Sequence, residues 1–218
     1  MKCKKLGNQL LLFTFKTQKE ITMSFFRMEE YYESPLKGLY QKKFSVYDFL
    51  NESMNEHGQI DYFSKWIGFN IPGHSILEWS NLNCPDYTSK EIEIMKHITS
   101  KVDVNKPFYV IAAKEQNTKV MDHEIAHALY YLNENYKDRM LDLSIKMRQL
   151  DRNNYNKMIK KLKNMGYNQS VFNDEVQAYM STSTKKELVE KFGLDYETAM
   201  PLARQFRKVL QEYNTFKK

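Results

Sequence analysis

Apolar and polar positions form two different patterns along this chain from Met23 onward. A repeat of 3.6 residues predicts amphipathic helices, whereas a short apolar run between turn residues predicts a buried strand. The clearest strand is residues 108–113, just after Pro107. Helices are predicted at residues 45–56, 88–100, 118–132, 137–165, 185–192 and 196–216. The mixture predicts an α+β fold with a small mixed sheet and a helical C-terminal half.

Capping residues predict where the helix at 88–100 begins. Thr88 and Glu91 have the spacing of a capping box, in which each side chain accepts a hydrogen bond from the backbone of the other. Further along this helix, Ile92, Met95 and Ile98 form an apolar stripe. We therefore expect that stripe to face the core.

Residues 45–80 are less regular. Ser45 is placed to cap a helix that runs to about residue 56, where His57 and Gly58 are suited to end it. Residues 62–80 are aromatic and are interrupted by glycine and proline. They are predicted to be a loop or short strands folded onto the core.

The first 22 residues differ in charge from the rest of the chain. Five lysines and one glutamate give 5 − 1 = +4, so 6 − 4 = +2 remains from Met23 onward. The apolar run at 10–15 is short and no small-x-small cleavage site follows it, so neither a signal peptide nor a membrane span is predicted. Lys19-Glu20 can be encoded AAGGAG, a ribosome-binding sequence ahead of Met23. Residues 1–22 are therefore interpreted as a leader that need not belong to the native protein, before a single domain at 23–218.

Composition narrows the classes of partner. Hydrophobic residues make up 42% and charged residues 28% of the chain, as is ordinary for a globular protein. Because the positive charge is concentrated in the leader, no nucleic-acid-binding face is predicted. The chain has two cysteines, Cys3 and Cys84, and only Cys84 remains if the leader is left out. A single thiol suits a reducing cytoplasm better than a disulfide-bonded secreted fold.

The pentapeptide His-Glu-Ile-Ala-His at residues 123–127 carries the clearest chemistry. Two histidines four residues apart lie on one face of a helix, so His123 and His127 can bind the same metal ion. Glu124 points to the side of that face, where it can act as a general base toward a water molecule. The surrounding segment has a cap at residues 117–118 and no glycine or proline, which favours a helix.

A catalytic zinc site uses three protein ligands and keeps one position open. No histidine follows the motif, so the third ligand must come from elsewhere in the chain. Glu175 is the best candidate, because residues 172–180 resemble the first turns of a helix with Asn173 or Asp174 as its cap. Ala178 is small enough to let this helix approach the histidine helix. Glu134 is the weaker rival.

With these residues the chain resembles the gluzincin metallopeptidases, in which H-E-x-x-H is followed by a glutamate ligand on a second helix. The resemblance implies a zincin-like domain that hydrolyses peptide bonds. It implies Zn²⁺ held by His123, His127 and Glu175, with Glu124 as the general base.

The resemblance covers residues 106–183 and departs from the family at one position. Thermolysin-like gluzincins have an aspartate four residues after the glutamate ligand, where this chain has Tyr179. Tyr179 is a candidate donor to the developing oxyanion. Asp122 and Asp174 are candidates for orienting a histidine ligand. The family also implies that the strand at 108–113 forms a sheet edge that pairs with the substrate backbone.

Residues 28–35 and 66–72, together with the motif, are more loosely similar to uncharacterised phage-encoded proteins. The expected function is therefore a zinc-dependent peptidase acting on a peptide or protein substrate in the cytoplasm, that of a bacterial host if the chain is phage-encoded. The alternative is a non-catalytic phage-type interaction or virion protein, in which a metal is structural or absent. Zinc content and peptide cleavage distinguish the two.

Overall fold

The computed structural model describes residues 1–33, 44–54, 60, 62–65, 67–82, 84 and 86–217. The chain divides into two compact units, Met1–Met121 and Asp122–Lys218, and the boundary falls within helix α7, Thr118–Leu132. The described part of the first unit combines a sheet with helices, and that of the second is helical. The α+β class is thus confirmed. His57, Gly58 and Trp66 lie outside the described residues.

Four strands form the sheet of the first unit, in the order β1-β2-β4-β3. They are β1 (Lys2–Lys5), β2 (Leu10–Phe15), β3 (Gly68–Pro72) and β4 (Tyr109–Lys114). β2 pairs with β4 in parallel, whereas β1–β2 and β3–β4 are antiparallel pairs. The sheet is therefore mixed, as predicted.

Residues 2–15 belong to this sheet, which differs from their interpretation as a leader apart from the domain. Leu11, Phe13 and Phe15 of β2 are at most 1% exposed and pack in the main apolar core. The short apolar run at 10–15 is a buried strand, because pairing with β1 and β4 engages its backbone while its side chains pack in the core.

The predicted role of residues 108–113 as a sheet edge is wrong. β4 lies between two neighbours, with Ile111 opposite Leu12 of β2 on one side and Asn70 of β3 on the other. Both rows of its backbone hydrogen-bonding groups are already engaged in the ladder. β4 therefore offers no free edge to a substrate backbone.

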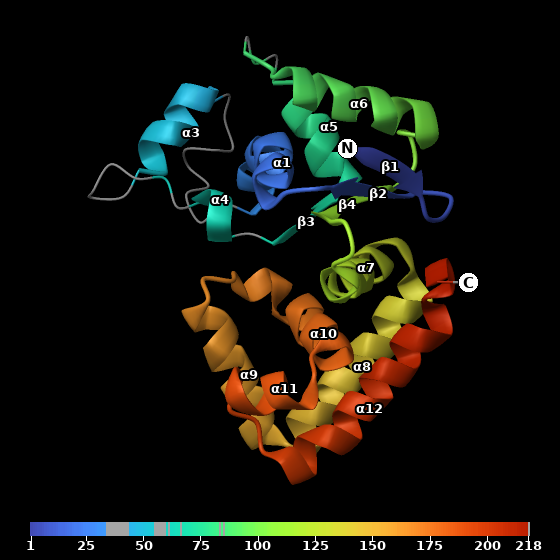
Figure 1. Ribbon diagram of the computed structural model, residues 1–218. Helices are drawn as coiled ribbons and strands as arrows, with labels where there is room; N and C mark the ends of the chain where they lie inside the picture. The colour runs from blue at the N-terminus through green and yellow to red at the C-terminus, as the bar shows by residue number, and fades with distance from the viewer. Residues whose placement is uncertain are drawn as a thin grey trace. The chain divides into compact units, whose positions relative to one another are not determined.

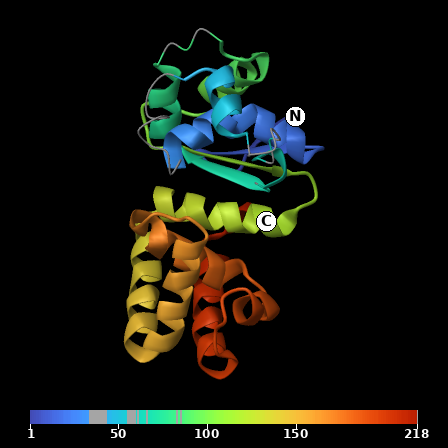
Figure 2. The ribbon, with the colours of Figure 1, turned by 90° about the vertical axis from the view of Figure 1, so that its left-hand side faces the viewer.

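Three helices cover one face of the sheet: α1 (Gln18–Glu33), α5 (Gly73–Ser80) and α6 (Ser89–Lys101) (Figures 1 and 2). The predicted capping box of Thr88 and Glu91 starts α6. Its apolar stripe differs from the prediction, because Ile94 and Ile98 are buried while Ile92 is 46% exposed.

The described residues between 44 and 80 contain more helix than predicted. Ser45 caps α3, Val46–Glu52, as expected, but the loop or strands predicted at 62–80 are α4 (Tyr62–Lys65), β3 and α5. Gly73 lets the start of α5 approach the neighbouring chain: its N–H donates to the carbonyl of Phe108 at 2.7 Å, and a Cβ there would lie 2.4 Å from the Phe108 ring.

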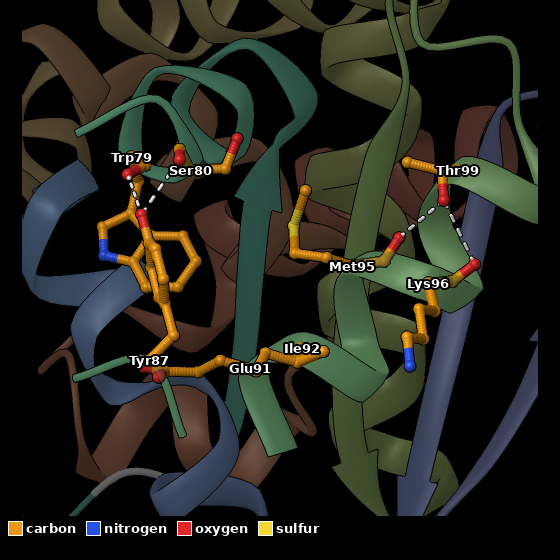
Figure 3. Close-up of a pocket in the computed structure, with 8 residues that line it drawn as sticks. All are labelled: Trp79, Ser80, Tyr87, Glu91, Ile92, Met95, Lys96 and Thr99. Carbon is orange, nitrogen blue, oxygen red and sulfur yellow. Dashed lines mark hydrogen bonds between the residues drawn. The ribbon is translucent and has the colours of Figure 1, made fainter. Parts of the chain in front are cut away.

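A pocket of about 320 Å³ lies within the first unit (Figure 3). It is lined by Trp79, Ser80, Tyr87, Glu91, Ile92, Met95, Lys96 and Thr99. The Tyr87 hydroxyl donates to the carbonyls of Trp79 and Ser80, at 3.2 and 2.9 Å. The candidate metal ligands His123, His127 and Glu175 belong to the second unit, and none of them is among the residues that line this pocket.

The second unit is built around α10, Phe172–Thr182, which packs against α8, α9 and α12. The single helix predicted at 137–165 is two helices, α8 (Glu134–Leu150) and α9 (Arg152–Asn164), because the Asp151 side chain caps a new start. α11 (Lys185–Glu190) and α12 (Tyr196–Tyr213) follow, with 3₁₀ turns at Gln169–Val171 and Thr215–Lys217. Within the described ranges, no helix combines the length and apolar character that crossing a membrane requires.

Candidate metal centre

Helix α7 presents both histidines of the motif on one face. Asn117 caps it by accepting a hydrogen bond from the N–H of Val120 at 3.2 Å, which confirms the predicted start. The rings of His123 and His127 lie nearly perpendicular, with centroids 4.9 Å apart. Their Nε2 atoms approach to 3.3 Å, so the two imidazoles point at a common position.

Glu175 reaches the same position from α10. Its Oε1 lies 3.7 Å from Nε2 of His127, and the ligand atoms of His123, His127 and Glu175 all lie within 4.8 Å of one another. Among the described residues this is the one group of three or more histidine, cysteine or acidic side chains placed to hold a metal ion. The rival Glu134 begins α8, is exposed and is not part of the group.

The donor set and spacing fit zinc. Two nitrogens at about 2.0–2.1 Å from a tetrahedral zinc ion lie about 3.3 Å from each other, which matches the separation of the two Nε2 atoms. Two imidazoles and one carboxylate are also a donor set found in catalytic zinc sites. His127 and Glu175 are shielded from water, at 2% and 5% exposed, whereas His123 is half-buried.

Asp174 holds His127 in the orientation that metal binding requires. An Asp174 oxygen lies 2.9 Å from Nδ1 of His127. Because a carboxylate only accepts, Nδ1 carries the proton and Nε2 is left to face Glu175. The predicted cap at Asn173 or Asp174 is wrong: Val171 precedes α10 and makes no side-chain cap.

Thr182 holds His123 in the same way, a contact that the sequence analysis missed. Its hydroxyl donates to the carbonyl of Ala178 at 2.7 Å and lies 3.1 Å from Nδ1 of His123. Since the hydroxyl proton is already engaged, Nδ1 of His123 is the donor. A signal existed: Glu175, Ala178 and Thr182 are spaced i, i+3, i+7 on one face of α10.

The Nε2 atoms of the two histidines are therefore both acceptors, and they face each other. Each imidazole uses its Nδ1 proton elsewhere, so the facing Nε2 atoms can be reconciled only by a shared cation, either a proton or a metal ion. Burial lowers the pKa of His127, but the charges of Asp174 and Glu175, with a smaller contribution from Glu124, raise it to well above its ordinary value. The surroundings thus favour positive charge.

The remaining predicted residues lie around this centre. Glu124 is 6% exposed. The Tyr179 ring packs on His123 with centroids 4.6 Å apart, and its hydroxyl is 3.3 Å from that of Tyr167. Burial, reinforced by the charge of Glu175, raises the pKa of Tyr179 to about 12, so its hydroxyl stays protonated at neutral pH. Asp122 precedes His123 on α7 and is partly buried.

No family model, curated protein or solved structure matches this chain. The argument for function therefore rests on the residues of the centre and their geometry.

Proposed function

We propose that this protein is a zinc-dependent peptidase of gluzincin type, with His123, His127 and Glu175 as the zinc ligands. The observation that carries the proposal is the convergence of two Nε2 atoms and one carboxylate oxygen, with each Nδ1 atom engaged elsewhere. Structural zinc sites are closed by four protein ligands, whereas catalytic sites keep a position open. Three ligands in the described part of the chain favour the catalytic type.

The chemistry follows from the placement of the side chains. When bound, zinc acts as a Lewis acid that polarises a carbonyl and acidifies water. Glu124 accepts the proton of the attacking water at its carboxylate and returns it to the leaving amine. Asp174 and Thr182 keep the Nδ1 protons in place, so that both Nε2 lone pairs remain directed at the metal position. Tyr179 is the candidate donor to the developing oxyanion.

The decisive experiment compares Glu124→Gln with the wild-type protein. Glutamine keeps the shape of the side chain but cannot accept the proton, so zinc content should be unchanged while cleavage of a peptide library is lost. Glu134→Gln, an exposed change on α8, is the matched control and should retain both properties. Wild-type cleavage by Glu124→Gln would exclude the proposed base. Zinc binding without any cleavage by the wild-type protein would favour the non-catalytic alternative.

A further inference from the structure

A chain of hydrogen bonds leads away from His127 through three helices. His127 on α7 donates from Nδ1 to Asp174 on α10 at 2.9 Å. Asp174 Oδ1 also accepts from Nε2 of Gln177, one turn further along α10, at 2.9 Å. Gln177 Oε1 in turn accepts from the hydroxyl of Tyr136 on α8 at 2.8 Å.

The direction of every bond in this chain is fixed by its neighbours. A carboxylate can only accept, so the Gln177 amide must turn its nitrogen toward Asp174. That orientation leaves the amide oxygen facing Tyr136, whose hydroxyl must donate. The same carboxylate oxygen then accepts the Nδ1 proton of His127. No reversed arrangement satisfies all the partners at once.

Burial makes this chain unusually well defined. Tyr136 and Gln177 are both 0% exposed, so water cannot replace their partners. Burial, together with the charge of Asp174, raises the pKa of Tyr136 far above its ordinary value, which keeps the hydroxyl protonated. Gln177 also anchors the local helix, because its carbonyl accepts from the Ser181 hydroxyl. Asp174 itself is only partly buried and therefore needs this support to keep one rotamer.

We infer that Tyr136 and Gln177 are positioning residues, which hold the Asp174 carboxylate against Nδ1 of His127 and so direct Nε2 of His127 at the metal position. The inference deepens the proposed function and rests on it, since it assigns the residues that prepare a zinc ligand. Neither residue touches the metal position, so both act through Asp174.

Tyr136→Phe and Gln177→Met test the positioning role directly, because each keeps the approximate shape of the side chain and removes its hydrogen bonds in the chain. Zinc affinity, measured against a competing chelator, should fall about 3- to 10-fold for Tyr136→Phe, less than for loss of a direct partner of the ligand. Exchange of the His127 Nδ1 proton with water, followed by NMR, should accelerate in both variants. That proton is present in the metal-free and the zinc-bound protein alike, so the second readout is independent of zinc.

Thr198→Val is the matched control for lost stability. It removes the hydroxyl of an exposed residue in the same unit, which accepts from the buried side chain of Asn154 at 2.8 Å, outside the chain of hydrogen bonds described above. It should lower the melting temperature without changing zinc affinity or Nδ1 proton exchange. If it weakens zinc binding as much as Tyr136→Phe does, the effect is one of stability and the inference is overturned.

The double variant decides whether the two residues act in series. If Tyr136 acts only through Gln177, the pair Tyr136→Phe and Gln177→Met should bind zinc no more weakly than Gln177→Met alone. Losses that multiply, or wild-type behaviour of Tyr136→Phe in both readouts, would overturn the inference. If the wild-type protein binds no zinc, the proposed function fails, while proton exchange still decides for or against the positioning chain.

Discussion

The two units each bury a cluster of charged side chains, and the clusters differ in whether the protein supplies the cation. In the first unit the fully buried side chain of Arg27 donates to Glu91 from Nε at 2.8 Å and from Nη2 at 2.6 Å. Its Nη1 donates to Asp86 at 2.8 Å. The guanidinium also lies 5.7 and 5.6 Å from the ring centroids of Trp79 and Tyr87. In this cluster the protein itself supplies the cation.

In the second unit the converging groups are carboxylates and imidazole acceptors. Asp174 and Glu175 lie 2.9 and 3.7 Å from the two nitrogens of His127, and Nε2 of His123 faces Nε2 of His127. Their charges raise the pKa of His127 despite its burial. The comparison teaches that a buried cluster of this sort is evidence for a bound cation only when the converging atoms are all acceptors and no side chain of the cluster supplies the cation. The first cluster stabilises a fold, and the second is suited to receive a cation.

The largest expected effect is on zinc binding by Glu175→Ala. Removal of the third ligand leaves two protein ligands, so the affinity should fall by several orders of magnitude. Competition with a chelator measures the loss, and Glu134→Ala should bind as the wild type does. The metal-free variant should be no less stable than the wild type, because the change relieves a concentration of negative charge. Retention of wild-type affinity would remove the gluzincin assignment.

Arg27→Met should have the next largest effect, on stability instead of metal binding. The change leaves Glu91 buried beside Asp86 with no cation, and breaking one side of a buried ion pair costs about 3–5 kcal/mol. Urea unfolding followed by tryptophan fluorescence measures it. Lys90→Met is the control, since its ion pair with Glu93 on the same helix is exposed and should matter little. A small change for Arg27→Met would erase the contrast between the two clusters.

Local signals predicted the first cluster's helix but not its partners. The capping box of Thr88 and Glu91 was readable because its atoms lie within one helical turn. The same Glu91 carboxylate also binds Arg27, 64 residues away, and nothing local marks that pairing. The parallel pairing of β2 with β4 was missed for the same reason, because it joins segments almost a hundred residues apart.

In the candidate metal centre, too, local features were predictable from the sequence and contacts between distant segments were not. His123, Glu124 and His127 were readable from helical spacing, and Glu175 from the need for a third ligand. Asp174 carried two predictions, as a helix cap and as a residue that orients a histidine. The cap is wrong, because a tertiary contact with His127 takes the carboxylate. Thr182 was overlooked because a threonine near a helix end is common, and only the fold brings it to His123.

Asp174→Ala should weaken zinc binding by about 10- to 100-fold, less than loss of a ligand, because it removes only the group that orients His127. Chelator competition measures the change, with Asn173→Ala on the same helix as the control. The loss of zinc affinity should be largest for Glu175→Ala, smaller for Asp174→Ala and negligible for Asn173→Ala. This order separates residues that bind the cation from residues that orient its ligands. An effect as large as that of Glu175→Ala would make Asp174 a ligand itself.

The smallest effect is expected from Thr182→Val, which removes the acceptor for Nδ1 of His123. A neutral hydroxyl forms a weaker hydrogen bond than a carboxylate, so the affinity should fall by about tenfold or less, below the loss for Asp174→Ala. Valine has nearly the same shape, and it also loses the hydrogen bond that the threonine hydroxyl donates to the carbonyl of Ala178.

Thr182→Ser restores the hydroxyl without the methyl group and should recover most of the lost zinc affinity, which a purely steric role would not allow. NMR of the zinc-bound protein provides a second check, because exchange of the His123 Nδ1 proton should quicken in the valine variant and return toward the wild-type rate in the serine variant. If serine binds as poorly as valine, the hydroxyl does not orient His123. Only His127 would then have a protein partner that orients it, namely Asp174, and His123 would depend on the metal itself for its orientation.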